Sequence, residues 1–315
     1  MAGLFQVFFW LSRDNLVTLN ENSFEKIESL SYSPFEGYDK NLLSSEQIAY
    51  DVNLFENFTN KLRTYGTLEA YKILQSSKDS NLPIDLGLWI GGDLEANNLE
   101  IQRALEILKE YPNRIQSVIV GNEVLLRKEL EPLELYAYID FMKSHTKKPV
   151  TTAETWDIWE KNPQLASHVD FLTIHILPYW EKVPIERYNE FIIEKYSVVE
   201  ELFPNRKIVI GETGWPSHGY NNNSAIPSIK NQAQAIRGFV NLAHEKGWHY
   251  NIIEALDQPW KGYDEGNVGQ YWGIFTTDRA LKFQLAGEVE LNKYWLYQMI
   301  AAIIIGALLT LFGLR

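Results

Sequence analysis

The chain has 315 residues, of which 45% are hydrophobic, 13% aromatic and 22% charged. That apolar content is enough for a large core and excludes a disordered or fibrous chain. The net charge of −12, without long runs of lysine or arginine, argues against a nucleic-acid partner. Because the sequence contains no cysteine, disulfides, thiol nucleophiles and cysteine-bound metals are excluded.

Residues 1–26 are predicted to be an N-terminal apolar segment and a linker. Residues 4–11 (LFQVFFWL) are apolar but too short to cross a membrane. No basic residue precedes this run and no A-x-A pattern follows it, so it makes a poor signal peptide. It is interpreted either as the remainder of a longer hydrophobic segment or as a short interfacial or partly buried stretch. Residues 12–26 are polar and are interpreted as a linker.

Residues 27–290 alternate between predicted strands and predicted helices. Several of the strands are apolar throughout, as expected for a parallel sheet covered by helices on its outer side. Strand–helix units between residues 27 and 283 predict a closed (β/α)₈ TIM barrel, with an open doubly wound sheet as the alternative. That alternative lacks the glycine-rich nucleotide-binding motifs that usually accompany it. The predicted strands are 27–33, 61–67, 84–90, 116–120, 149–152, 169–176, 207–210 and 250–256.

Apolar residues recur at helical spacing between several of these strands. Ser44 is a predicted helix N-cap, and Gly247 stands where a helix C-cap is expected. The predicted apolar faces are Ile48, Val52, Phe55 and Leu62, then Ile101, Leu105 and Leu108, then Ala233, Ile236, Val240 and Ala243.

Residues 294–314 form an uncharged stretch flanked by Lys293 and Arg315. At about 1.5 Å per residue, a helix of this length spans roughly 32 Å, against a hydrocarbon core of about 30 Å. Trp295 and Tyr297 lie near one end, where aromatic side chains favour the membrane interface. We therefore predict a C-terminal transmembrane helix rather than a buried core helix. The two flanking cations leave its orientation open.

Polar and aromatic side chains follow the predicted strands, where a (β/α)₈ barrel places its catalytic groups. Glu123 follows the fourth strand and Glu212 the seventh, so the two lie nearly opposite each other across the barrel mouth. Two carboxylates that flank a bond are the groups needed for glycoside hydrolysis. Aromatic residues suit the same chemistry because the apolar faces of sugar rings stack on them. The other predicted residues of this mouth are Tyr32, Tyr65, Asn122, Glu154, His175, Tyr179, Glu254, Asp257, Trp260 and Lys261.

Eight short motifs occur in order between residues 27 and 283. They are SYSPF, RTYGT, GNEVLLR, TTAETW, IHILPYW, IGETGWPS, DQPWK and EGNVGQYWGIF. In these motifs the chain resembles glycoside hydrolase family 17, the β-1,3-glucanase family, and is similar to its bacterial branch. The resemblance implies a (β/α)₈ barrel and a retaining mechanism with Glu123 as acid/base and Glu212 as nucleophile.

The resemblance also implies roles for neighbouring residues. Asn122 is expected to contact the sugar 2-hydroxyl, and Tyr179 to hydrogen-bond the nucleophile. Lys261 and Glu265 are expected to be auxiliary polar residues near the substrate, and Trp215 of IGETGWPS is expected to bind substrate. Related bacterial domains accompany membrane-bound β-glucan synthases, and some transfer glucan chains instead of hydrolysing them. A β-glucanosyltransferase is therefore the alternative activity, and a synthase a candidate partner.

No metal or cofactor is implied by the sequence. The histidines lack metal-ligand spacing, and no serine has the G-x-S-x-G context of a nucleophile. His175 is interpreted either as a core residue or as a substrate contact. The alternative to an enzyme is a non-catalytic glucan-binding or scaffold domain. The loss of Glu123 or Glu212 would favour it, and the sequence contains both.

The retaining mechanism sets expectations for the geometry and the location of the site. The carboxyl groups of Glu123 and Glu212 are expected about 5–5.5 Å apart, with Glu212 ionised and Glu123 protonated when the reaction starts. Because a glucan polymer lies outside the cytoplasm, we expect a periplasmic or extracellular barrel held at the cell membrane by residues 294–314.

Overall fold

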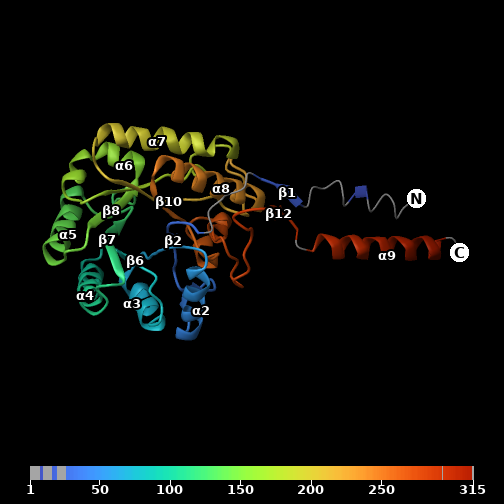
Figure 1. The fold of residues 1–315 in the computed structure, drawn as a ribbon, viewed down its shortest axis with the longest axis horizontal. Coiled ribbons are helices and arrows are strands. Elements are labelled where there is room, and N and C mark those ends of the chain that lie inside the picture. The colour runs from blue at the N-terminus through green and yellow to red at the C-terminus, as the bar shows by residue number, and fades with distance from the viewer. Residues whose placement is uncertain (1–7, 10–15, 20–25, 293, 314–315) are drawn as a thin grey trace.

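The structure, a computed structural model, describes residues 8–9, 16–19, 26–292 and 294–313. Within them, eight parallel strands close into a barrel, which confirms the predicted (β/α)₈ architecture and excludes the open sheet (Figure 1). Each predicted strand overlaps one strand of the barrel. In barrel order these are β2 (Leu30–Ser31), β5 (Leu62–Arg63), β6 (Ile84–Leu88), β7 (Ile115–Asn122), β8 (Val150–Thr155), β9 (Leu172–His175), β10 (Ile208–Thr213) and β11 (His249–Ile252).

Helices connect consecutive strands and cover the outside of the barrel (Figure 1). After β11 the described chain continues in 3₁₀ helices, η3 (Pro259–Gly262) and η4 (Asn267–Tyr271), rather than in an α-helix. Proline and closely spaced glycines disfavour a regular helix in this segment. The covering helices are α2 (Ser45–Glu56), α3 (Thr67–Ser76), α4 (Leu94–Glu110), α5 (Pro132–His145), α6 (Trp156–Lys161), α7 (Tyr188–Leu202) and α8 (Ile229–Lys246), with η1 (Pro163–Ser167) and η2 (Ile185–Arg187) beside them.

Both predicted caps are confirmed. The Ser44 hydroxyl accepts a hydrogen bond from the Gln47 amide at 3.2 Å, and Gly247 ends α8 in the left-handed conformation with φ 66°. The assignment of Leu62 to a helical face is wrong. Because α2 ends at Glu56, Leu62 falls in β5, where it is fully buried.

Two small antiparallel ladders lie outside the barrel. β3 (Phe35–Glu36) and β4 (Asn41–Leu42) form a hairpin directly after β2. β1 (Leu16–Thr18) pairs with β12 (Glu288–Glu290), so part of the segment expected to be a linker is a strand. The rest of residues 1–26, apart from 8–9, 19 and 26, lies outside the described residues.

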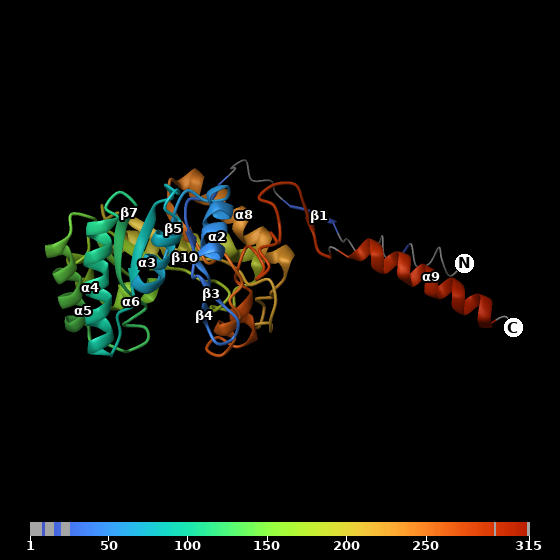
Figure 2. The ribbon, with the colours of Figure 1, turned by 90° about the horizontal axis from the view of Figure 1, so that it is seen from below.

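Helix α9 (Trp295–Gly313) stands apart from the barrel (Figures 1 and 2). The segment Trp295–Phe312 has a mean hydropathy of 2.0, and none of it is buried within the protein. A helix of this length measures about 28 Å, close to the thickness of a hydrocarbon core. By length and composition α9 is able to cross a membrane.

A buried arginine ties the end of the domain to the barrel. Arg237 of α8 is 1% exposed and donates to the carbonyl groups of Gln284, Ala286 and Gly287, just before β12. We predict that Arg237→Ala lowers the free energy of unfolding, measured by urea denaturation, by about 2 kcal/mol, because it leaves buried carbonyls unpaired.

The matched control is Arg187→Ala. The Arg187 side chain is 54% exposed and pairs with Glu190 and Glu194. Exposed pairs of this kind contribute less than about 1 kcal/mol. An equal loss of stability in both variants would contradict the proposed role of Arg237.

Candidate active site

A cleft of about 520 Å³ opens where the barrel strands end. Of the predicted residues, Tyr65, Asn122, Glu123, Glu212, Trp260, Lys261 and Glu265 line it. The residues that line it without having been predicted are Ser33, Phe35, Lys40, Gly66, Leu68, Glu69, Trp89, Arg127, Ile253 and Asp264. Ser33, Phe35, Gly66 and Arg127 lie in the motifs quoted above, so the signal for these four was present in the sequence.

Glu123 and Glu212 approach each other in this cleft. One carboxylate oxygen of each and a ring nitrogen of His175 all lie within 4.8 Å of one another. Retaining glycosidases hold their carboxyl groups about 5–5.5 Å apart and inverting enzymes about 6.5–9.5 Å. The closest oxygens of Glu123 and Glu212 are therefore near enough for the carboxyl separation that the retaining mechanism needs.

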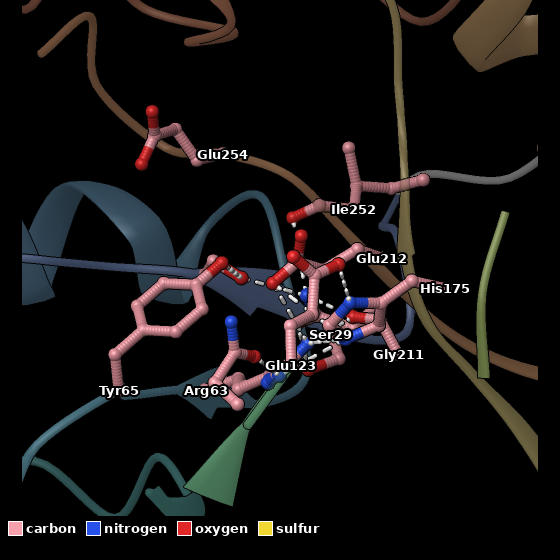
Figure 3. A network of polar contacts seen from close by, with 12 residues as sticks. Ser29, Arg63, Tyr65, Glu123, His175, Gly211, Glu212, Ile252 and Glu254 are labelled. Atoms are coloured by element: carbon pink, nitrogen blue, oxygen red, sulfur yellow. Dashed lines mark hydrogen bonds and ion pairs between the residues drawn. The ribbon is translucent and has the colours of Figure 1, made fainter. Parts of the chain in front are cut away.

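Arg63 of β5 lies between these groups (Figure 3). Its side chain is 2% exposed, and its Nη1 lies 3.4 Å from Oε1 of Glu212. Nη2 donates to Oδ1 of Asn122 at 2.7 Å, and Nη1 donates to the carbonyl of Gly211. Arg63 was not predicted as a site residue, although it lies in the predicted strand 61–67 and in the motif RTYGT, and a buried arginine is almost always paired.

The sequence keeps a glycine at position 211 for a steric reason. A Cβ there would lie 2.3 Å from Cγ2 of Thr173 and 3.1 Å from Cδ2 of His175. Any larger residue would push β9 and the His175 ring away, and with them the carbonyl that accepts from Arg63.

His175 connects Arg63 to Glu123. Its Nε2 lies 3.3 Å from both Nη1 and Nη2 of Arg63, and its Nδ1 lies 2.7 Å from Oε1 of Glu123. A guanidinium only donates, so we infer that Nε2 accepts and that Nδ1 carries the proton donated to Glu123. His175 is 1% exposed and contacts Glu123 from below the cleft rather than lining it.

The surroundings of Glu123 favour its charged form. Burial raises the pKa of its carboxyl, but the His175 hydrogen bond and the charges of Arg63 and Arg127 outweigh burial and hold the pKa below its ordinary value. Without substrate, Glu123 is therefore arranged as a base. This differs from the expectation that it is protonated at the start.

The backbone at Glu123 is held in an unusual conformation. Its φ is 54°, in the left-handed region, and its amide donates to the carbonyl of Ala153 at 2.7 Å. The next turn is fixed by Glu154, whose carboxylate accepts from the amides of Leu125 at 2.7 Å and Leu126 at 3.3 Å. Glu154 is fully buried and does not line the cleft, and its carboxylate is used by the backbone of the Glu123 loop.

Three further side chains that were predicted to bind substrate point away from the cleft. The Tyr32 hydroxyl donates to Asp51 of α2 at 2.8 Å, the Trp215 indole to the carbonyl of Ile226 at 3.0 Å, and Asp257 pairs with Lys282 at 2.7 Å. All three are buried and none lines the cleft. The reason is that successive side chains of an extended segment point to opposite sides, so a place at a strand end does not set direction.

The expected hydrogen bond from Tyr179 to the nucleophile is not formed. Its hydroxyl donates to the carbonyl of Tyr220 at 2.6 Å, and the residue is fully buried. A phenol has one proton to donate, so it is directed to Tyr220 instead of Glu212.

Glu254 reaches the cleft only through Lys261. Nζ of Lys261 lies 3.0 Å from both carboxylate oxygens of Glu254, which is 1% exposed. Burial raises the pKa of Glu254 to about 7, against the opposing charge of Lys261. Burial also raises the pKa of Glu265, and the charges of Glu212 and Glu123 add to that effect.

The cluster of Glu123, His175 and Glu212 has the donor atoms of a metal site. However, Nδ1 of His175 already faces Glu123, and Nε2 faces Arg63. The guanidinium, 3.4 Å from Glu212, supplies the positive charge that a metal ion would bring. The donor set therefore fits a bound cation poorly.

The sequence and the fold identify the family. The BtgE/BtgC glycoside hydrolase domain matches residues 29–273. The chain belongs to this glycoside hydrolase family. The match spans the barrel from its first strand past its last and includes both Glu123 and Glu212.

Relatives of known name support the assignment. A glucan 1,3-beta-glucosidase of Schizosaccharomyces pombe is 27% identical over 255 residues, covering 75% of this chain and 79% of that protein. A probable family 17 glucosidase of Saccharomyces cerevisiae is 25% identical over 260 residues, covering 80% and 66%. An active-site mutant of Rhizomucor miehei beta-1,3-glucanosyltransferase in complex with laminaritriose superposes with a TM-score of 0.73 at 25% identity, covering 81% of this chain and 95% of that one. These three relatives are fungal and do not support the bacterial branch expected from the motifs.

The raised carboxyl pKa values predict how stability depends on pH. Burial raises the pKa of Glu154 to about 8 and those of Glu69 and Glu254 to about 7, against about 4.3 in an unfolded chain. The folded state keeps protons that the unfolded chain releases, so the free energy of unfolding should fall by a few kcal/mol as the pH rises from about 5 to about 8.

Glu154→Gln tests this assignment, because an amide has no proton to release in that range. Urea denaturation at several pH values should show a flatter pH dependence for this variant than for the wild type, whatever its absolute stability. Glu200→Gln, at an exposed position of α7, should keep the wild-type slope. Identical slopes in all three proteins would remove Glu154 from the explanation.

Proposed function

We propose that this protein is a retaining glycoside hydrolase acting on β-1,3-glucan, with Glu212 as nucleophile and Glu123 as acid/base. The observation that carries the proposal is the approach of the two carboxylates to within 4.8 Å beside the Arg63 guanidinium. The substrate class is inferred from the relatives, which are named as a glucan 1,3-beta-glucosidase and a beta-1,3-glucanosyltransferase, the second of which has a similar fold.

The reaction proceeds in two displacements. A carboxylate oxygen of Glu212 attacks the anomeric carbon while Glu123 gives a proton to the leaving glycosidic oxygen, forming a covalent glycosyl-enzyme. Glu123, now a carboxylate, then takes a proton from water or from a sugar hydroxyl. The resulting oxygen nucleophile attacks the same carbon and releases Glu212.

The pKa of Glu123 must change during this cycle. Its side chain is 22% exposed, so a sugar that covers it removes water and raises its pKa towards the acid form. Formation of the glycosyl-enzyme removes the charge of Glu212, which lowers the pKa of Glu123 again. His175 and Arg63 then favour the base form that the second displacement needs.

Hydrolysis and transfer share every group in this scheme and differ in the acceptor. The similarity to a beta-1,3-glucanosyltransferase makes transglycosylation the second candidate function. Incubation of the protein with β-1,3-gluco-oligosaccharides of one length separates the two. Shorter products alone indicate hydrolysis, and longer products indicate transfer. If neither forms, the proposed function is wrong and the non-catalytic glucan-binding alternative stands.

We predict different defects for the two glutamates. Glu212→Gln should lower kcat on β-1,3-glucan by at least about 10⁴-fold, because an amide cannot form the covalent intermediate. Glu123→Gln should also be slow on glucan, yet keep the first displacement on an aryl β-glucoside whose phenol leaves without a proton. Azide should restore turnover of that substrate, since an anionic nucleophile needs no base.

The readout is the release of phenol and the anomeric configuration of the azide product, followed by NMR. Retained configuration for Glu123→Gln with azide is the expected result. Rescue of Glu212→Ala, whose shorter side chain leaves room for azide, with inverted configuration is the complementary result. An exchange of the two behaviours would reverse the roles, and full activity of either variant would remove that residue from the mechanism.

We further propose that residues 294–314 anchor the protein in the cell membrane with the barrel in the periplasm or outside the cell. Support comes from the apolar, unburied helix α9 and from a polymeric substrate that lies outside the cytoplasm. A membrane-bound β-glucan synthase is a partner that fits this location, because the glucan chain that the synthase extends would be the donor substrate of the present enzyme. A nucleic-acid partner is disfavoured by the net charge of −12.

Protease added to intact spheroplasts tests the orientation. The barrel should be digested before lysis, because it faces outward, while a cytoplasmic marker protein stays intact. Immunoblotting of the barrel follows the reaction. Protection of the barrel until detergent opens the membrane would place it in the cytoplasm and refute the proposed location.

A further inference from the structure

Four aromatic residues gather at one edge of the cleft. The β3–β4 hairpin lies beside the segment of η3 and η4 (Figure 2), where Tyr38 donates a hydrogen bond to Gln270 at 3.3 Å. Phe35 and Trp260 line the cleft itself. Tyr38 follows Phe35 by three residues in the hairpin, and the backbone amide of Tyr263 donates to the carbonyl of Trp260 at 3.2 Å. We call Phe35, Tyr38, Trp260 and Tyr263 the aromatic rim.

The inner half of the aromatic rim is held in place. The Trp260 indole donates to Oε1 of Gln258 at 2.6 Å. Nε2 of Gln258, a residue that is 1% exposed, donates to the carbonyl of Ser33 at 3.0 Å. Nζ of Lys40 lies 4.2 Å from the centre of the Trp260 ring and 5.0 Å from that of Phe35. These contacts fix the ring of Trp260 at the base of the hairpin.

The outer half of the aromatic rim is exposed although it is aromatic. Tyr38 is 57% and Tyr263 is 74% exposed, and their ring centres lie 6.1 Å apart in an edge-to-face arrangement. Scattered exposed aromatics are ordinary, but adjacent ones continuous with a cleft indicate a binding surface. Asp264, which follows Tyr263, lines the cleft, so the chain leads directly from one to the other.

We propose that Tyr38 and Tyr263 bind the part of a glucan chain that lies beyond the reacting bond. The proposal rests on the proposed function, because it assigns a further contact to the same substrate. A neutral pyranose presents an apolar face for the exposed rings and hydroxyls for the phenols. The continuity with Trp260 in the cleft favours the chain already bound there over a separate protein partner.

The consequence is a dependence on chain length. A polymer reaches Tyr38 and Tyr263, whereas a short oligosaccharide that fills only the cleft does not. The double variant Tyr38→Ala/Tyr263→Ala should therefore lose about tenfold in kcat/KM on β-1,3-glucan polymer through a higher KM. On the shortest oligosaccharide that is turned over, its kcat/KM should stay within about twofold of the wild type.

Tyr50→Ala is the matched control, since Tyr50 lies on α2, is 56% exposed and does not line the cleft. It should leave both substrates unaffected. Equal losses of the double variant on polymer and oligosaccharide, or no loss on either, would overturn the proposal while leaving the proposed function in place.

A binding measurement separates the two claims. In gels that contain β-1,3-glucan polymer, the full chain carrying Glu212→Gln should be retarded, and the triple variant Tyr38→Ala/Tyr263→Ala/Glu212→Gln should be less so. Equal mobility of the two proteins would refute the proposal. Failure of the wild-type protein to act on any glucan, with retardation still dependent on the two tyrosines, would overturn the proposed function alone.

Discussion

The buried charge of Arg63 is the constraint on which the site depends. A guanidinium that is 2% exposed loses its hydration and must find several acceptors inside the protein. It finds them on three other strands of the barrel: Asn122 at the end of β7, the ring of His175 on β9 and the carbonyl of Gly211 on β10. A single cation thus fixes the relative positions of the strand ends that carry Glu123 and Glu212, the two glutamates proposed to be catalytic.

Two neighbouring side chains, His175 and Glu154, explain how the unusual backbone of Glu123 is tolerated. A glutamate with φ of 54° is unfavourable by itself, and it persists only where neighbouring contacts determine the conformation. Those contacts come from two sides. His175 holds the carboxylate of Glu123, while Glu154 holds the amides of the turn behind it. Since neither contact uses the cleft, the position of Glu123 is set before any sugar binds.

The sequence predicted the barrel and its two glutamates because both follow from strand order. A strand-end position places a residue at the mouth, but the direction of its side chain depends on backbone details that periodicity does not contain. Tyr32 and Asp257 therefore lie at strand ends as expected, but their side chains point away from the cleft, towards Asp51 and Lys282. Arg63 was missed because the predicted strand 61–67 extends beyond it, whereas β5 ends at Arg63, so the search for polar residues at strand ends began too late in the chain.

The two buried cations at the cleft, Lys261 and Arg63, interact with different carboxylates. Lys261 pairs with Glu254 and approaches Glu265, whereas Arg63 serves Glu212 and, through His175, Glu123. Oε1 of Glu212 has no hydrogen-bond donor among the described residues, so this oxygen is held by charge alone. That oxygen is buried, 3.4 Å from Nη1 of Arg63, so it is not the oxygen that a sugar in the cleft would meet. The other carboxylate oxygen of Glu212 is therefore the one that the proposed mechanism uses to attack the anomeric carbon.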